Sequence, residues 1–447
     1  MIEISPEILT VAFLLSIFLG VLTGYHVALI LIGVGTTFGY FTVGPNVGYL
    51  LYSRVSSMIM NYNMIAIPLF TFMGVMLSRS DISDRLYHAL HLLLGRLRGG
   101  LALSTVILGT ILAAGLGVVQ ASVSMLTTVS LGPMVRRGYS KELACGAICA
   151  GGTLGILIPP SIMLVVLGMT AAVSVGRLFF GAFIPGFILS GLYLCYIIVR
   201  SWLQPQIAPA APIEERQVSF TKKMALLFVS IIPPIAIMVS VLGTIFFGVA
   251  TVYEAAGVGA AASVLITVAY RKFSLNLLKH AMRETLRVTG FVMLITACAN
   301  ATVGVFVYFG GKEVIEDMVL ALPLGPWGAF VAIMLVTFIL GMFMDWISII
   351  LIVVSILIPI APTLGFNPVW FALMICVNLQ MSFMTPPLAL AIFVCQGSAD
   401  PELGVTNADI IRGVVPFIFL VMIGLGLFAA FPQLMLWLPN KMICGFR

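Results

Sequence analysis

Two proline pairs stand beside polar residues inside long apolar stretches of this sequence. The segments are GGTLGILIPPS at 151–161 and NLQMSFMTPP at 378–387. A proline inside a helix leaves backbone carbonyls unpaired, and the ends of a broken helix carry partial charges. Within a membrane, carbonyls and hydroxyls are suitable ligands for a dehydrated Na⁺, and amide N–H groups can bind a carboxylate. The two segments therefore predict a binding site for Na⁺ and an organic anion.

Only two carboxylates, Asp345 and Glu254, lie inside or against the apolar stretches. A charge at bilayer depth costs at least about 2.5–3.5 kcal/mol, which makes such a residue a candidate for function. We favour a sodium-binding role for Asp345, with a structural cap of the following helix as the alternative. Glu254 stands near the start of an apolar run, where helix capping and packing are equal alternatives to a transport role.

The predicted site contains further side-chain oxygens and several glycines. As Na⁺ ligands, through carbonyl or side-chain oxygen, we expect Asp345, Gly152, Gly155, Asn378, Ser382 and Thr385. As substrate-binding residues we expect Gln120, Ser122, Ser124, Thr153, Ser161, Ser348 and Thr385. Serine and threonine also bond backbone carbonyls within helices, which is the structural alternative for each. Interhelical hydrogen bonding is the default interpretation for Asn61, Asn63 and Asn300.

These residues belong to a chain whose composition predicts a membrane protein. Of the 447 residues, 61% are hydrophobic and 9% are charged, and the mean hydropathy is +1.18. A soluble domain carries about 25% charged residues, so membrane lipid must be much of the solvent here. The apolar runs are continuous, whereas a β-barrel alternates apolar and polar residues. The sequence therefore predicts an all-α integral membrane protein.

The apolar runs predict ten spans and two hairpins. The spans are 8–23, 25–43, 60–78, 142–173, 178–199, 224–247, 252–270, 288–309, 369–396 and 410–435. The stretches 99–135 and 326–362 are too long for one helix, and glycines or polar residues interrupt each near its middle, which predicts re-entrant hairpins. Amphipathic segments at 80–97 and 311–322, here called the arms, precede the hairpins.

The distribution of basic residues predicts the orientation. With both stretches treated as hairpins and the N-terminus outside, most Lys and Arg residues fall on the cytoplasmic side. The exceptions are Arg54, Arg177, Lys312, Lys441 and Arg447. An excess of basic residues marks cytoplasmic loops, so we expect a multi-pass protein of the bacterial inner membrane with a periplasmic N-terminus.

The two halves of the chain resemble each other. Gly138 corresponds to Gly365, Tyr139 to Phe366, and Pro159-Pro160 to Pro386-Pro387, a constant offset of 227 positions. Each half is predicted to hold three spans, an arm, a hairpin, a proline-broken span and a final span. Five crossings per half is an odd number, so we expect two inverted repeats, which is typical of secondary transporters with a site at the repeat interface.

Motifs for other functions are missing from the sequence. It contains no nucleotide-binding loop of the G-x-x-x-x-G-K-[ST] type, no H-E-x-x-H and no G-x-S-x-G. Its seven cysteines form no C-x-x-C, so neither disulfides nor structural zinc are predicted. The net charge of +6 is explained by the Lys and Arg residues that mark cytoplasmic loops of membrane proteins, and it does not indicate a nucleic-acid partner. We expect a transporter with no enzyme activity and no organic cofactor.

Four segments in order carry a resemblance to a known family. They are AIPLF at 66–70, GTLGILIPPS at 152–161, EAAGVG at 254–259 and MTPP at 384–387. Together they resemble the large membrane subunit of tripartite ATP-independent periplasmic (TRAP) transporters, the DctM-type family, over essentially the whole chain. Many members have a Gly-Ser-Ser cluster at the first hairpin tip, where this chain has Gln120-Ala121-Ser122-Val123-Ser124, so the ligands at that tip are left open.

The resemblance implies a Na⁺-coupled elevator, in which hairpins and broken helices slide as a transport domain across a scaffold. It implies two partners: a small four-helix membrane subunit, here expected as a separate chain, and a periplasmic binding protein that delivers a small organic anion, a carboxylate or sulfonate. We divide the chain accordingly into scaffold (1–98, 174–325 and 398–447) and transport domain (99–173 and 326–397).

Three alternatives remain open at this point. The nearest is a stand-alone Na⁺- or H⁺-coupled carboxylate carrier that needs no binding protein. A channel is less consistent with proline-broken repeats, which suit alternating access. A membrane enzyme or an assembly scaffold is disfavoured by the missing catalytic motifs.

Overall fold

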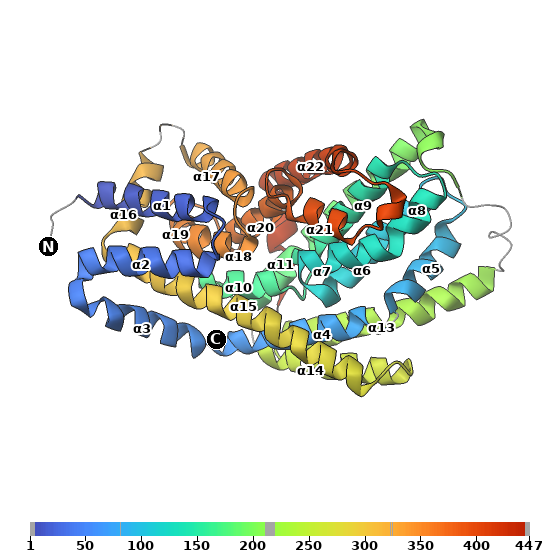
Figure 1. Ribbon diagram of the computed structural model, residues 1–447, viewed down its shortest axis with the longest axis horizontal. Coiled ribbons are helices and arrows are strands. Elements are labelled where there is room, and N and C mark those ends of the chain that lie inside the picture. Colours follow the sequence, from blue (N-terminus) through green and yellow to red (C-terminus); the bar gives the residue numbers. More distant parts are fainter. Residues whose placement is uncertain (1–4, 81, 211–219, 322, 324, 443–447) are drawn as a thin grey trace.

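The computed structural model describes residues 5–80, 82–210, 220–321, 323 and 325–442, and helices make up most of this part of the chain (Figure 1). Within these residues there is no β-strand. The all-α prediction is therefore confirmed, as apolar sequence within lipid must satisfy its backbone hydrogen bonds inside each helix.

The helices of the first half are α1 (Pro6–Leu22), α2 (Val27–Val43), η1 (Gly44–Asn46), α3 (Val47–Ile59), η2 (Tyr62–Ile65), α4 (Ala66–Ser78), α5 (Ile82–Leu94), α6 (Gly100–Leu116), α7 (Val119–Leu126), the π-helical η3 (Thr127–Leu131), α8 (Gly132–Arg136), α9 (Lys141–Thr153), η4 (Leu154–Ile156), α10 (Ile162–Thr170), α11 (Val175–Leu203) and η5 (Pro205–Ile207).

Those of the second half are α13 (Phe220–Phe246), α14 (Val252–Ala269), α15 (Leu275–Tyr308), α16 (Gly311–Leu320), α17 (Gly325–Gly341), α18 (Trp346–Ile349), the π-helical η6 (Ile350–Val354), α19 (Ser355–Leu357), η7 (Ile358–Ile360), α20 (Pro368–Met384), α21 (Leu390–Ser398), η8 (Pro401–Leu403), α22 (Asn407–Ala430), α23 (Gln433–Leu436) and η9 (Pro439–Lys441).

Six of the described helices are long and apolar enough to cross a membrane, or up to seven if the bent pair Tyr62–Ser78 and Ile82–Leu94 counts as one span. Each predicted span and each arm falls on a helix or a broken helix. The prediction missed α3, which continues from α2 after the Gly44–Asn46 break, and it began α15 at 288 although this helix starts at Leu275. Polar and basic residues lower the hydropathy of both missed segments.

The two long apolar stretches form helical hairpins. In hairpin 1, α6 is separated from α7 by a break at Gly117 and Val118, and these two helices pack against each other. In hairpin 2, the chain breaks at 342–345 between α17 and α18, which are also in contact. The interruptions predicted from sequence are confirmed, while re-entry from one membrane side remains a prediction.

The order of elements recurs in the two halves. An arm (α5 or α16) precedes a hairpin, a proline-broken helix (α9–α10 or α20–α21) and a long helix (α11 or α22). The Pro-Pro peptides at 159–160 and 386–387 are cis. The halves interlock, because α21 packs on α7 of hairpin 1 and α10 packs on α18 of hairpin 2. Inversion of one half relative to the other remains a prediction.

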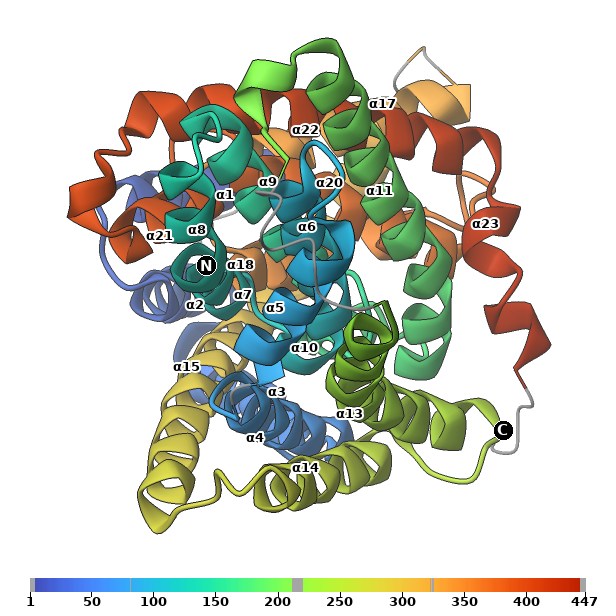
Figure 2. The same ribbon diagram turned by 90° about the vertical axis from the view of Figure 1, so that its right-hand side faces the viewer.

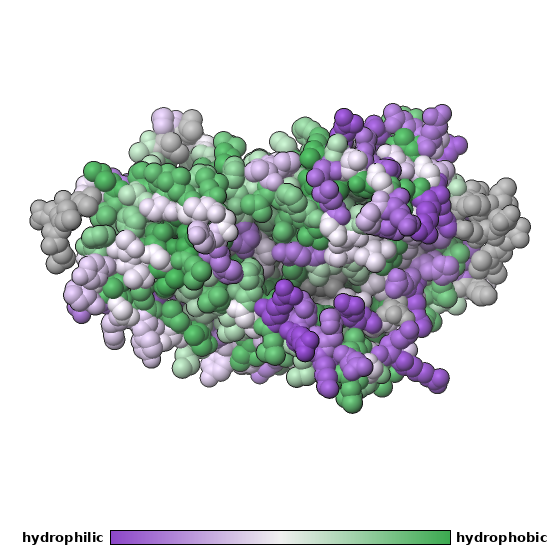
Figure 3. All heavy atoms as spheres, in the orientation of Figure 1, coloured by the Kyte–Doolittle hydropathy of each residue, from purple (hydrophilic) through white to green (hydrophobic). Residues whose placement is uncertain are grey.

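The hairpins and broken helices lie at the centre of the molecule. Figure 2 shows α6, α7, α10 and α18 in the middle, with α14 below them, α15 at the lower left, α22 above and α11 along the right-hand side. Hydrophobic residues cover much of the visible surface, and hydrophilic residues gather over α8, α9 and α21 and around the start of α15 (Figure 3). The central elements are therefore surrounded by other helices, and much of the visible surface is hydrophobic.

Close helix packing at Gly109 gives a first testable prediction. A Cβ atom at Gly109 in α6 would lie 2.7 Å from the carbonyl oxygen of Gly151 in α9, too close for either backbone to tolerate. We expect Gly109→Ala to destabilise the protein by about 1–3 kcal/mol, measured by thermal unfolding in detergent. In the control Gly191→Ala, no atom lies within 4 Å of the added Cβ, so unchanged or higher stability is expected. Equal effects of the two changes would contradict this account.

Candidate functional site

Each hairpin tip lies against the proline-containing loop of its own half. In the first half, a Cβ at Gly117 would lie 3.3 Å from the Ile162 nitrogen and 3.7 Å from the Pro160 oxygen. In the second half, the Leu388 amide donates a hydrogen bond of 3.0 Å to the Met342 carbonyl. The structure thus brings each predicted hairpin tip together with the predicted broken segment.

Side chains also connect the two halves. The Gln380 side-chain nitrogen donates to the Thr153 carbonyl oxygen at 3.2 Å, which joins the ends of α20 and α9. These two positions are 227 residues apart, the offset of the sequence repeat. The Ser398 and Ser124 hydroxyls are 2.8 Å apart and join α21 to hairpin 1. The proline-broken helices and the hairpins therefore form one connected unit.

Three buried oxygen atoms near this junction have no hydrogen-bond partner within the described part of the chain. They are Gln120 Oε1, Ser122 Oγ and Gln380 Oε1. Ser122 lies beside Gly155, where an added Cβ would come within 2.7 Å of its hydroxyl. A buried polar atom without a partner is costly, and oxygen atoms are the ligands that alkali and alkaline-earth cations prefer. These atoms suit a cation or an ordered water molecule.

Asp345 caps α18, the helix that follows the break in hairpin 2. Its Oδ2 accepts a hydrogen bond of 3.1 Å from the Ile347 amide, and its Oδ1 accepts one from the Ser348 hydroxyl. Both interactions satisfy the first turn of the helix, as the structural alternative predicted. A carboxylate has about four lone-pair sites, so these two bonds leave capacity for an ion.

The other predicted ligands lie in the same region but bond to backbone carbonyls. Their acceptors are Ala150 for Thr153, Ile156 for Ser161, Met334 for Asn378, Phe338 for Ser382 and Met381 for Thr385, at 2.7–3.2 Å. Gly152 packs directly against Val123 of hairpin 1. These bonds fix the broken helices, and the hydroxyl oxygens keep a lone pair for a ligand.

A cavity of about 450 Å³ lies where the two hairpin tips face α4 and α15. Its lining includes Gln120 and Ala121 of hairpin 1, Ile162 of α10, and Trp346 and Ile347 of hairpin 2. Small-molecule sites occupy about 300–1,000 Å³, so a small organic molecule fits. Of the three polar residues predicted at the first tip, only Gln120 lines this cavity, while Ser122 is buried behind it.

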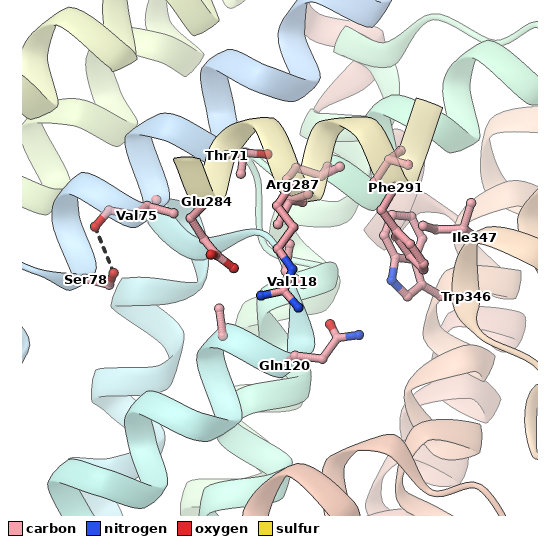
Figure 4. Close-up of a pocket in the computed structure, with 15 residues that line it drawn as sticks. Thr71, Val75, Ser78, Val118, Gln120, Glu284, Arg287, Phe291, Trp346 and Ile347 are labelled. Carbon is pink, nitrogen blue, oxygen red and sulfur yellow. Dashed lines mark hydrogen bonds between the residues drawn. The ribbon is translucent and has the colours of Figure 1, made fainter. Parts of the chain in front are cut away.

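The cavity contains two charged side chains that sequence reasoning did not place there. Glu284 and Arg287 extend from α15 toward the segment of hairpin 1 that carries Gln120 (Figure 4). None of the residues predicted for the site is basic, whereas Arg287 lines this cavity. Arg287 makes no hydrogen bond or ion pair with another described residue, and guanidinium groups bind carboxylates through paired N–H donors.

Glu254 has a structural role. Its Oε2 accepts hydrogen bonds of 2.7 Å from the Thr251 amide and from the Thr251 hydroxyl, which forms a capping box at the start of α14. The capping alternative is confirmed for this residue. Among the described residues, no cluster of His, Cys, Asp or Glu could hold a transition metal.

The Gln380 bridge gives a second prediction. Gln380→Met keeps the volume but leaves the Thr153 carbonyl without its donor, so we expect a loss of about 1 kcal/mol in the free energy of unfolding. It also removes the partnerless Oε1, so Na⁺ should raise the unfolding temperature less than in the wild type. Gln396→Met, on an exposed site of α21, is the control. A Gln380→Met protein stabilised by Na⁺ as strongly as the wild type would exclude an ion at this oxygen.

Membrane-length helices around two hairpins and a cavity that contains charged side chains define the class of integral membrane transport proteins. The family model described as "Tripartite ATP-independent periplasmic transporter, DctM component" matches residues 11–434. The chain therefore belongs to the DctM family, the large permease component of these transporters, and is a protein of the bacterial inner membrane.

Characterised relatives support this assignment. The chain is 33% identical over 384 residues to the C4-dicarboxylate TRAP transporter large permease protein DctM of Pseudomonas aeruginosa, covering 85% of this chain and 87% of that one. It is 27% identical to the sialic acid TRAP transporter permease protein SiaT of Haemophilus influenzae, covering 98% and 69%. The Alcanivorax borkumensis YdaH transporter has a similar structure, with a TM-score of 0.64, 14% identity and coverage of 96% and 99%. The last comparison concerns the fold alone.

Proposed function

We propose that this permease couples the inward movement of Na⁺ to the uptake of a small organic anion. The observation that carries the proposal is the cavity between both hairpin tips and α15, where Arg287 supplies positive charge beside Gln120. The anion binds in this cavity, and Na⁺ binds at the adjoining broken segments. Relatives that transport C4-dicarboxylates and sialic acid, both organic acids, support an anionic substrate.

Two ion positions follow from the geometry. One lies at the first tip, where Ser122 Oγ and Gln380 Oε1 have no hydrogen-bond partner among the described residues. The other lies at the second tip, where the Asp345 carboxylate has free lone pairs beside the break in the chain at 342–345. Each position is adjacent to the anion cavity, so Na⁺ supplies a counter-charge for the substrate as well as the driving force.

The transport cycle is an elevator movement with two partner proteins. The hairpins and broken helices form one connected unit through the Gln380–Thr153 and Ser124–Ser398 contacts, and the cavity lies between this unit and the α4–α15 scaffold. Sliding of the unit along α4 and α15 moves the site across the membrane. A periplasmic binding protein delivers the anion, and a small membrane subunit enlarges the scaffold.

The test is uptake into proteoliposomes that contain this chain, its small subunit and its binding protein. Succinate and sialic acid are the first anions to try, with and without an inward Na⁺ gradient. We expect uptake only when both the gradient and the binding protein are present. Uptake that continues without the binding protein would identify a stand-alone carrier, and uptake driven by a proton gradient alone would overturn sodium coupling.

A further inference from the structure

A second cavity, of about 190 Å³, lies on the same boundary between the scaffold and the hairpins. Its scaffold wall comes from α3, η2 and α15. Its other wall comes from α10 and from η6 and α19 of hairpin 2. The lining residues are Ser57, Met58, Asn61, Met64, Met169, Thr170, Thr296, Asn300, Leu351 and Ser355. Six of these ten side chains carry a hydroxyl or an amide, and none is charged.

Three helical segments run from the first cavity to the second. The residues that line the two cavities are Ile162 and Thr170 on α10, Val292 and Asn300 on α15, and Ile347 and Ser355 on hairpin 2. Each pair is eight residues apart, which is about 12 Å along a helix. The segments contact one another, and between the cavities they contribute the fully buried apolar residues Val166, Ile295 and Ile350. An apolar plug therefore separates this polar cavity from the first one, whose mostly apolar wall carries the charged residues Glu284 and Arg287.

The two asparagines give the second cavity unused hydrogen-bonding capacity. Asn61 accepts a bond of 3.0 Å from the Asn63 amide through Oδ1, and its side-chain nitrogen finds no acceptor within the described chain. Asn300 donates to the Arg54 carbonyl at 2.7 Å, which leaves its oxygen available. The Thr170 and Thr296 hydroxyls bond carbonyls of their own helices and keep lone pairs.

We propose that this second cavity is a neutral hydrogen-bonding station for the transported organic anion, on the other side of the plug from Arg287. Asn61 donates to a carboxylate or sulfonate oxygen, and the hydroxyls and Asn300 accept from hydroxyl groups of the solute. The inference rests on the proposed function. In the predicted orientation, Lys141 at the start of α9 is cytoplasmic and Arg177 at the start of α11 is periplasmic. Thr170 is the last residue of α10, close in sequence to Arg177. The second cavity, which Thr170 lines, therefore lies toward the periplasm. Neutral donors hold an anion weakly enough to release it to the deeper, charged cavity.

The test uses two membrane-impermeant thiol reagents of opposite charge on Ser355→Cys in right-side-out vesicles. The sulfonatoethyl thiosulfonate is itself a small organic anion, and the trimethylammonium thiosulfonate is the cationic comparison. We expect the anionic reagent to label Ser355→Cys at least tenfold faster than the control Val354→Cys, which is fully buried one residue away. Labelling of the parent protein, with its native cysteines, is subtracted.

A second substitution tests the donor. Adding Asn61→Leu to Ser355→Cys should slow the anionic reagent at least fivefold and leave the cationic one unchanged, whereas Asn63→Leu, which does not line the cavity, should slow neither. Labelling of Ser355→Cys no faster than of Val354→Cys, labelling only in inside-out vesicles, or equal slowing of both reagents would overturn the proposal. Labelling needs neither Na⁺ nor the partner proteins. A negative uptake experiment would therefore count against the proposed function, and a negative labelling experiment would count against the second cavity as an anion site.

Discussion

Asp345→Asn is expected to raise the Na⁺ concentration for half-maximal uptake at least about tenfold, equivalent to about 1.4 kcal/mol. The carboxylate accepts hydrogen bonds from Ile347 and Ser348 at the start of α18. Asparagine is as good a helix cap as aspartate, so this substitution removes the charge and retains the cap. A unit charge about 4 Å from an ion contributes about 4 kcal/mol at an effective dielectric constant of 20, which makes a large loss of affinity the expected result.

A comparison of two substitutions separates the structural from the ionic role. Asp345→Ala removes both the cap and the charge, so it should lower the unfolding temperature as well as sodium-dependent uptake. Asp345→Asn should unfold close to the wild-type temperature in the absence of Na⁺. An Asn variant with wild-type sodium dependence, measured in the same proteoliposomes, would leave Asp345 with the capping role alone.

Arg287→Gln is expected to raise the substrate KM for uptake at least about tenfold for a dianion such as succinate, with a smaller effect on a monoanion. Its guanidinium is a basic group in the cavity between the hairpin tips and α15, and it makes no ion pair within the described residues. Exposed charges are screened by salt, so the difference between the variant and the wild type should shrink as ionic strength rises.

Two neighbours on α15 provide controls of opposite kinds. Glu284 lines the same cavity, so Glu284→Gln removes a negative charge and should leave the KM unchanged or lower it. Arg283 is exposed and does not line the cavity, so Arg283→Gln should behave as the wild type. A similar rise in KM for Arg283→Gln and Arg287→Gln would indicate a general surface-charge effect instead of a site.

Local features of the sequence predicted much of the fold. Gly117 and the 342–345 break interrupt stretches that are too long for one helix, and both breaks are present. The proline pairs lie where α9 and α20 end. The α3 helix was missed because Arg54 and several serines lower its hydropathy, although Gly44-Pro45-Asn46 just before it marks a break inside one longer helix.

The cavity residues were harder to predict because they depend on contacts between distant segments. Arg287 was assigned to a cytoplasmic loop, since the apolar run was taken to start at 288, but α15 begins at Leu275 and carries the arginine to the hairpin tips. The partnerless oxygen of Gln380 is visible only once α20 is placed beside α9. Two signals in the sequence pointed to it: the polar character of the 378–387 segment and the repeat offset of 227 residues that separates Gln380 from Thr153.

The Gln380 side chain has a consequence for how the two ends of the site respond to each other. Its amide nitrogen donates a hydrogen bond to the Thr153 carbonyl at the end of α9, and its oxygen has no hydrogen-bond partner in the described part of the chain. The two ends of an amide share one conjugated system, and hydrogen bonds in series polarise one another. A cation at the oxygen would make the N–H a stronger donor to Thr153 and tighten the contact between the halves. Ion binding in the second half would thus make the end of α9 in the first half more rigid. This is a form of cooperativity that needs no movement of the backbone.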